Sequence, residues 1–558
     1  MKTILSFFLA FLLCAGAGAQ KDYTSLVNPF IGTGGHGHTY PGATVPFGMV
    51  QLSPDTRLKG WDGCSGYHYS DSAIYGFSHT HLNGTGIEDY CDILLQPTTG
   101  KRQWMAEEYK SSFSHQKEKA SPGYYAVHLD KYGVDVELTT TLRTGLHKYQ
   151  FSKDTKEGNV LIDLSHRDIV LDSRLEKVDD YTLRGKRQSR SWALNQTLYF
   201  VMRFSQPITD YVVALDDVEK GALQNAEGKN VKAYASFNVS SGKPLLVKVG
   251  LSAVSEEGAQ KNLEAEHPGF DFDNTLAAAK KSWNKELGRI EVEGGTKEEQ
   301  TIFYTALYHT NINPNVYMDV DGQYRGTDNQ IHTTKGFTNY TVFSLWDTHR
   351  AYHPLMTILN QKRTVDWINT FLAQDEQGGM LPVWELSANE TFCMIGYHSV
   401  PVIVDAYQKG IRGFDAQKAL KAMRRYAESD RFGLAHYRSN GFLSNDKEPE
   451  SVSKTLEYAY DDWCIAQMAG WLGDTATKRM YLQRAQQYKN LYDPSTGHMR
   501  GKLGSMWYSP FDPREINHFY TEGNSWQYSF TAQQDIAGLM QLHGGRDAFA
   551  RKLTELFT

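Results

Sequence analysis

The chain has 558 residues and a formal net charge of −6, with 40% hydrophobic and 13% aromatic residues. Its length exceeds the roughly 250–300 residues at which a single hydrophobic core stops growing, so we expect at least two folded domains. The composition excludes a disordered chain. Because no cluster of Lys and Arg is interleaved with aromatic residues, nucleic acid and anionic membrane surfaces are excluded as partners.

The first twenty residues, MKTILSFFLAFLLCAGAGAQ, have the pattern of an export signal. One lysine is followed by an apolar run from Ile4 to Leu13 and by small residues ending at Ala19. The run is too short to span a bilayer, so we predict a signal peptide over 1–19 and no transmembrane segment in the mature chain. The mature protein is then periplasmic or at the bacterial cell surface. Leu13 before Cys14 disfavours a lipoprotein.

Residues 20–270 are predicted to form a β-sandwich. Short alternating segments such as YYAVHLD, VDVELTTTLR, LYFVMRF and PLLVKVGL lie between clusters of turn-forming residues, a spacing typical of two packed antiparallel sheets. Beyond residue 270 the spacing of the apolar residues changes from that of a strand to that of a helix. DNTLAAAKKSWNKELGRIEV has its apolar residues on one stripe and predicts a linker helix over 271–295.

Residues 296–558 are predicted to be mainly helical. Aromatic-rich helices alternate with amphipathic ones, which indicates an (α/α)6 toroid whose loops form a site at one end. About nine or ten helices can be recognised where a toroid has twelve, and the last segment, RDAFARKLTELFT, has no glycine or proline stop. We therefore expect an incomplete toroid whose C-terminal part is missing.

Glu522 in YTEGNSWQYSF is the strongest candidate for a catalytic residue. A carboxylic acid among aromatic residues suits glycoside chemistry, because apolar neighbours keep it protonated and aromatic faces stack on sugar rings. The alternative is an acid that stabilises the N-terminus of a helix starting near Ser525.

SLWDTHRAYHP places Trp346, Asp347 and Arg350 within a turn and a half of helix. Trp346 and Arg350 would share one face, and Asp347 could accept hydrogen bonds from neighbouring sugar hydroxyls. The alternative is a buried Asp347–Arg350 ion pair. Further along, GGMLPVWELSANE supplies Trp384 and Glu385, for which a substrate-positioning or structural role is favoured over that of a second catalytic carboxylate.

EYAYDDWC carries Glu457, Asp461 and Asp462 on a strongly helical segment. Glu457 and Asp461 are four residues apart, and like charges at this spacing repel unless a cation faces them. We expect that cation to be a lysine or arginine from the next hairpin rather than calcium.

Histidines gather in two glycine-rich N-terminal stretches, NPFIGTGGHGHTYPGATVPFGMVQLSPDTR and GWDGCSGYHYSDSAIYGFSHTHLNGTG. Imidazoles can bind metal, but loops that pack against the second domain are the favoured interpretation. Trp61 is the candidate for stacking on a sugar. Four scattered cysteines remain after the signal and predict free thiols or at most one disulfide: Cys64, Cys91, Cys393 and Cys464.

Several long motifs in order, from VNPFIGTGGHGHTYPGATVPFGMVQLSPDT through GWDGCSGYHYSDS, GFSHTHLNGTG, SLWDTHR and GGMLPVWE to EGNSWQY, resemble the exo-acting α-mannosidases of glycoside hydrolase family 92. The resemblance runs from about Val27 to the last residue. It implies a β-sandwich, a linker helix and an (α/α)6 catalytic domain that cleaves α-mannosidic bonds with inversion, using Ca²⁺. It also implies that Glu522 is the general acid, that Asp347 holds the terminal mannose, and that Trp61 contacts the next sugar.

The sequence departs from the family pattern in two motifs, one that supplies calcium ligands and one that supplies the general base; both are expected beyond Thr558. The resulting hypothesis is an exported α-mannosidase acting on mannose-rich glycans, with Trp346, Arg350, Trp384 and Glu385 lining the pocket. The alternative is an inactive carbohydrate-binding fragment without base and calcium ligands. A polysaccharide lyase is disfavoured because no basic groove for a uronic-acid polymer is evident.

Overall fold

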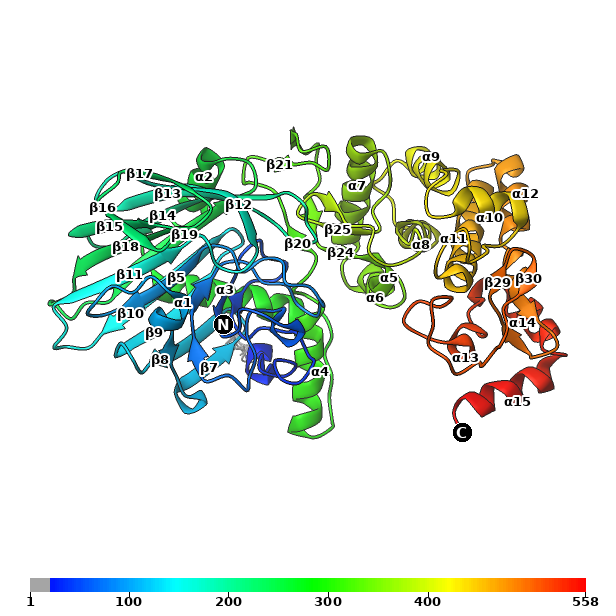
Figure 1. Cartoon of the computed structure of the whole chain (residues 1–558), viewed down its shortest axis with the longest axis horizontal. Coiled ribbons are helices and arrows are strands. Elements are labelled where there is room, and N and C mark those ends of the chain that lie inside the picture. Colours follow the sequence, from blue (N-terminus) through cyan, green and yellow to red (C-terminus); the bar gives the residue numbers. More distant parts are fainter. Residues whose placement is uncertain (1–20) are drawn as a thin grey trace, which may run out of the picture.

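The computed structural model describes residues 21–558 and places a β-sandwich domain before a helical domain. In Figure 1 the sandwich lies at the left, and the helices from α7 to α12 lead away from it to the right. The fold class predicted from the sequence, a sandwich followed by helices, is confirmed. The predicted signal peptide and Cys14 lie outside the described residues.

Two large antiparallel sheets form the sandwich. The first has eight strands in the order β1 (Ala43–Thr44), β2 (Gln51–Asp55), β4 (Gly76–Ser78), β5 (Leu94–Thr98), β11 (Glu157–Asp163), β18 (Val231–Asn238), β15 (Asp210–Leu215) and β16 (Val218–Gly221). The second has nine in the order β17 (Asn225–Gly228), β12 (Ile169–Lys177), β13 (Thr182–Arg190), β14 (Gln196–Phe204), β19 (Leu245–Ser252), β10 (Thr144–Phe151), β9 (Val134–Thr140), β8 (Tyr124–Leu129) and β7 (Glu118–Ser121).

The alternation of residues along these strands explains the sandwich. In β8, Tyr125, Val127 and Leu129 are buried while the residues between them are only partly buried. Side chains of a strand point to opposite faces in turn, so one face of each sheet is apolar and packs against the other sheet. A single hydrophobic core that includes Phe77, Ile162 and Phe200 fills the space between the sheets.

Three helices connect the sandwich to the second domain: α2 (Glu256–Glu266), α3 (Phe272–Leu287) and α4 (Lys297–His309). Helix α2 packs on β14 and β19, within residues predicted to be β-structure; Ser255 caps its N-terminus by accepting a hydrogen bond from the amide of Gly258. Helix α3 ends at Leu287, before the end of the predicted 271–295 helix. Its Trp283 indole donates to the carbonyl of Thr44 at 2.6 Å and fixes the helix to the sandwich.

The helical domain contains α5 (Leu345–Thr348), α6 (Tyr352–Leu359), α7 (Gln361–Gly378), α8 (Ser399–Gln408), α9 (Ala416–Ala427), α10 (Leu434–Asn440), α11 (Ser451–Trp471), α12 (Thr475–Arg484), α13 (Ser525–Tyr528), α14 (Ile536–Leu542) and α15 (Arg546–Leu556). Helix α11 packs against α8 and α12, and α6 against α7. Such neighbouring pairs are consistent with part of an (α/α)6 toroid, which stays a prediction. Within residues 21–558, none of the helices has the length and apolarity needed to cross a membrane.

Phe47 joins the two domains. Its amide donates to the carbonyl of Asn311 at 2.8 Å, and its carbonyl accepts from the amide of Val316 at 2.9 Å. The ring is fully buried in the core of the helical domain, near Trp367. A residue of the sandwich domain is thus part of the second domain's core.

Trp367 provides a test of this shared core. Its ring is fully buried and lies within 6.1 Å of the rings of Phe47, Tyr340, Tyr352 and His353. We expect Trp367→Ala to lower the free energy of unfolding by about 3–5 kcal/mol, because it opens a cavity. Denaturant unfolding followed by circular dichroism measures this. Trp471→Ala, at a helical position that is 42% exposed, is the matched control, and an equal loss in both variants would contradict the prediction.

Candidate active site at the domain interface

A cavity of about 680 Å³ lies between the two domains. The sandwich domain contributes Trp61, the loop 83–86 and Trp192, and the helical domain contributes residues from a helix, a strand and loops, including Asp347, Trp384, Cys393, Met394 and Glu522. Its size is that of a small-molecule site. Four of the residues predicted from the sequence therefore line one cavity: Trp61, Asp347, Trp384 and Glu522.

A small three-stranded sheet positions Asp347 and Trp384. Strand β24 (Phe343–Ser344) pairs with β25 (Trp384–Leu386), which pairs with β26 (Asn389–Glu390), and Ser344 lies directly opposite Trp384. Asp347 follows on α5 with an exposed side chain that accepts a hydrogen bond from the Ser344 hydroxyl. The motifs WDTHR and VWE thus meet through strand pairing, although about forty residues separate them.

Glu385 does not line the cavity, so this part of the predicted site is wrong. Adjacent residues of a strand point to opposite faces, and Glu385 is only 1% exposed. Its carboxylate accepts hydrogen bonds from the Thr341 hydroxyl at 2.9 Å and the Ala388 amide at 2.6 Å. Burial raises its pKa to about 8. This burial and these hydrogen bonds favour the structural role over the substrate-positioning role, both of which the sequence had allowed.

Glu522 stands in the turn before α13, with its side chain exposed and a left-handed backbone φ of 45°. Asn524, not Glu522, caps α13: its side chain accepts from the amide of Gln527. Trp526 does not face Glu522: it packs edge-on against His498 at 4.6 Å and below the Lys552 ammonium at 3.9 Å. The Glu522 carboxyl borders the cavity, whose wall includes Trp61 and Trp384.

A second cavity of about 230 Å³ adjoins Glu522 on its other side. It is lined by Trp346, Arg350, Glu457, Thr521, Glu522, Gly523, Gln527, Tyr528 and Thr531. Arg350 pairs with Glu457 at 2.9 Å, so the alternative of an Asp347–Arg350 pair is wrong. The Arg350 guanidinium lies 5.5 Å from the Trp346 ring, as expected for residues sharing a face. Trp346 and Arg350 thus border this cavity and not the larger one.

His398 supplies the cation that the repulsion between Glu457 and Asp461 predicted. Its Nδ1 lies 2.9 Å from Asp461 and its Nε2 lies 3.0 Å from Glu457, all three side chains being fully buried; the second contact is an ion pair outside hydrogen-bond alignment. Burial alone would lower the pKa of His398, but the two carboxylates outweigh it and raise the pKa to about 10. The cation between the two carboxylates is therefore a histidine, while an arginine, Arg350, pairs with Glu457 on its outer side.

His349 stacks on this imidazolium at a centroid distance of 4.0 Å and an interplanar angle of 13°. Burial and the neighbouring positive charge lower its pKa to about 3, so it is neutral. The group His349, His398 and Glu457 brings three metal-ligating atoms together. Two of the three are nitrogens, whereas Ca²⁺ takes six to eight oxygens; the group does not fit calcium.

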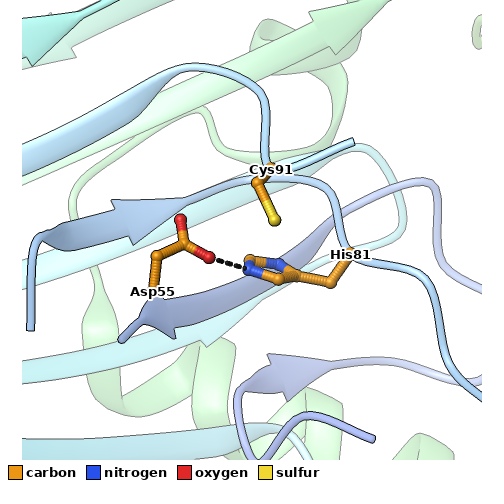
Figure 2. A group of neighbouring side chains, drawn as sticks. All are labelled: Asp55, His81 and Cys91. Carbon is orange, nitrogen blue, oxygen red and sulfur yellow. Dashed lines mark hydrogen bonds and ion pairs between the residues drawn. The ribbon is translucent and has the colours of Figure 1, made fainter. Parts of the chain in front are cut away.

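The second group with metal-ligating atoms is Asp55, His81 and Cys91, which Figure 2 shows converging inside the sandwich domain. His81 Nε2 lies 2.9 Å from Asp55, and His166 Nε2 lies 3.0 Å from its other oxygen. Burial opposes ionisation, yet the two imidazoles hold the pKa of Asp55 well below its usual range. Burial raises the pKa of the Cys91 thiol. With one sulfur, nitrogens and a single carboxylate, this group does not fit calcium either.

Two histidines of the glycine-rich loops, His36 and His38, contact neighbouring loops in the way the favoured scaffold interpretation expects. His38 Nδ1 donates a hydrogen bond to the carbonyl of Thr85 at 2.9 Å, and the His38 ring packs edge-on against Trp61 at 4.2 Å. His36 pairs with Asp62 at 2.6 Å. These contacts fix Trp61 at the cavity wall. The four cysteines of the described residues are free thiols.

Carboxylates and tryptophans around a cavity between a β-sandwich and a helical domain are typical of a carbohydrate-active enzyme. The model of the glycosyl hydrolase family 92 N-terminal domain matches residues 26–252, and that of the family 92 catalytic domain matches residues 258–558. This chain belongs to glycosyl hydrolase family 92 and is a glycoside hydrolase.

Solved structures and a curated relative agree with this assignment. The family GH92 α-mannosidase BT3965 from Bacteroides thetaiotaomicron is 40% identical, with a TM-score of 0.93 over 96% of this chain and 75% of that one, and another structure of it contains mannoimidazole. The inverting mannosidase BT2199 from the same organism is 32% identical, with a TM-score of 0.90 over 95% and 74%. An uncharacterized secreted glycosidase from Arthroderma benhamiae is 27% identical over 96% of this chain and 74% of that protein.

The His398 ion pairs predict a pH dependence of stability. A histidine in an unfolded chain has a pKa of about 6.5, and the folded pKa is about 10. The stabilisation is therefore complete below about pH 6.5 and is lost as the pH rises toward about 10. We expect the denaturation midpoint to fall over this window in the parent chain and to fall less in His398→Gln.

The matched control is His518→Gln, at an exposed position. Thermal or urea unfolding between pH 6 and 10 measures all three proteins. If His398→Gln keeps the slope of the parent, the ion pairs do not contribute to it.

Proposed function

We propose that this chain is an exo-acting α-mannosidase that removes terminal α-linked mannose from mannose-rich glycans with inversion of configuration. The observation that carries the proposal is the meeting of Glu522, Asp347 and Trp61 at one interdomain cavity, in a chain 40% identical to an α-mannosidase. The mannoimidazole bound by that relative supports a mannose-like sugar as the ligand. The inverting mannosidase BT2199 supports inversion.

Glu522 is assigned the role of general acid. Its exposed carboxyl borders both cavities, so a glycosidic oxygen can approach it from the larger one. Proton transfer from Glu522 to that oxygen would let the leaving sugar depart as an alcohol. Trp61, 56% exposed at the cavity wall, would stack on the departing sugar.

Asp347 is assigned to hold the terminal mannose. Its exposed carboxylate accepts one hydrogen bond from Ser344 and has further lone pairs for sugar hydroxyls. Hydrogen bonds to a charged acceptor are about twice as strong as neutral ones. Arg350 and Trp346 line the smaller cavity together with Glu522. There they would limit where the mannose ring can lie.

Inversion needs a second carboxylate about 6.5–9.5 Å from the acid to activate water. That base, and the Ca²⁺ implied by the family resemblance, stay predictions; neither metal-ligating group of the described residues fits calcium. The chain spans 74–75% of the length of the relatives it matches. We also propose export, supported by the signal-like first residues and by the secreted relative.

Glu522→Gln tests the acid. We expect mannose release from α-linked mannobioses to fall about 10²–10⁴-fold, as for loss of a general acid, while binding of methyl α-mannoside is kept. Release is measured in calcium and again in EDTA, where the family resemblance predicts a loss. Glu555→Gln, exposed on α15, is the control. An unchanged rate refutes the role of Glu522, and absence of release by the parent with retained binding favours the carbohydrate-binding alternative.

Asp347→Asn tests the sugar-holding role. Loss of charge-assisted hydrogen bonds should weaken binding of methyl α-mannoside about tenfold to a hundredfold. Titration calorimetry in the Glu522→Gln background measures binding without turnover. Asp154→Asn, in an exposed loop of the sandwich domain, is the control. Equal affinities for the two Asp variants would remove Asp347 from the sugar site.

A further inference from the structure

Trp192 lines the interdomain cavity but has no part in the proposed reaction. It lies in the turn Ser191–Asn195 between β13 and β14, and 40% of its side chain is exposed. Its indole is open to a cavity whose lining is mainly apolar, a setting that suits stacking on the apolar face of a sugar ring. Its sequence, SRSWALNQ, has the composition of an ordinary hairpin turn and so did not indicate Trp192 as a candidate.

The turn that carries Trp192 is held rigidly. Asp89, fully buried, accepts hydrogen bonds from the amides of Trp192 at 3.1 Å and Ala193 at 2.9 Å. Asn195 and Asn389 exchange two hydrogen bonds of 3.1 Å between the two domains. The orientation of the turn is therefore fixed relative to both domains, which lowers the entropic cost of binding a ligand on it.

Trp384 fixes the ring itself. The two indoles meet edge to face, with centroids 5.8 Å apart and planes at 81°, a favoured aromatic geometry. Trp384 is only 4% exposed. It therefore supports Trp192 from the side and leaves the exposed part of the Trp192 ring for the cavity.

Trp61 and Trp192 are separate surfaces of the cavity wall. Trp61 packs against His36 and His38, and Trp192 packs against Trp384; the ring contacts found in residues 21–558 do not join the two tryptophans. An indole face covers about one pyranose ring, because stacking uses the apolar C–H face of the sugar. Two separate indoles indicate two stacked sugars.

We propose that Trp192 is a second sugar-binding platform, which takes a pyranose of an α-mannoside beyond the one on Trp61. The site then prefers chains of three or more sugars over disaccharides. This rests on the proposed function, since the terminal mannose must lie at Asp347 and Glu522 for further sugars to reach the tryptophans. Trp192 acts on affinity for the longer ligand and takes no part in proton transfer.

The experiment compares ligands of increasing length. In the full chain carrying Glu522→Gln, titration calorimetry measures methyl α-mannoside, α-linked mannobioses and α-linked mannotrioses. Trp192→Ala should weaken mannotriose binding about threefold to tenfold and leave methyl α-mannoside unchanged. Trp192→Phe, which keeps an aromatic face, should retain most of the affinity. Trp471→Ala, at a 42% exposed tryptophan outside the cavity, is the control.

The outcomes separate the platform from the proposed function. Equal affinity of the parent and Trp192→Ala for mannotriose overturns the platform alone. An equal loss for every ligand also overturns it, because Trp192 would then act by supporting Trp384. If the parent binds none of the mannosides, the proposed function fails together with the platform.

Discussion

The packing of Phe47 into the helical domain is the contact on which the site depends. Glu522 and Asp347, the proposed acid and the proposed mannose-binding carboxylate, lie on the helical domain, whereas Trp61 and Trp192 lie on the sandwich. A cavity made from two domains keeps its shape only if the domains do not move against each other. The backbone bonds of Phe47 to Asn311 and Val316, with its buried ring, give that rigidity. The two hydrogen bonds between Asn195 and Asn389 form a second link between the domains.

The second constraint is the neutralisation of the buried carboxylates of Glu457 and Asp461. Two carboxylates on one face of α11 are buried only because His398 lies between them, with Arg350 on the outer side of Glu457. An unpaired buried carboxylate would cost several kcal/mol. Since Arg350 also lies at the Trp346 ring, the compensation fixes the wall of the smaller cavity beside Glu522. Stability of the domain and geometry of the site therefore depend on the same ion pairs.

The sequence predicted the architecture well because strand alternation and helix periodicity are local signals. The sequence also indicated Trp61, Asp347 and Glu522 as site residues, because they lie in recognisable motifs. It placed Glu385 wrongly, because the short strand β25, whose alternation turns that side chain inward, was not recognised. His398 was missed because its partners Glu457 and Asp461 lie some sixty residues away, and only folding brings them together.

The backbone around Glu522 shows how an exposed acid can still be held in place. The Thr521 amide donates to Ser453 on α11 at 2.8 Å, and the Thr521 carbonyl accepts from the Tyr528 hydroxyl at 2.7 Å. Asn524 caps α13 on the other side. Between these two anchors Glu522 takes a left-handed conformation with φ of 45°, which costs a non-glycine residue about 1–2 kcal/mol. The fold thus directs the carboxyl through its backbone, and its oxygens stay open to a substrate.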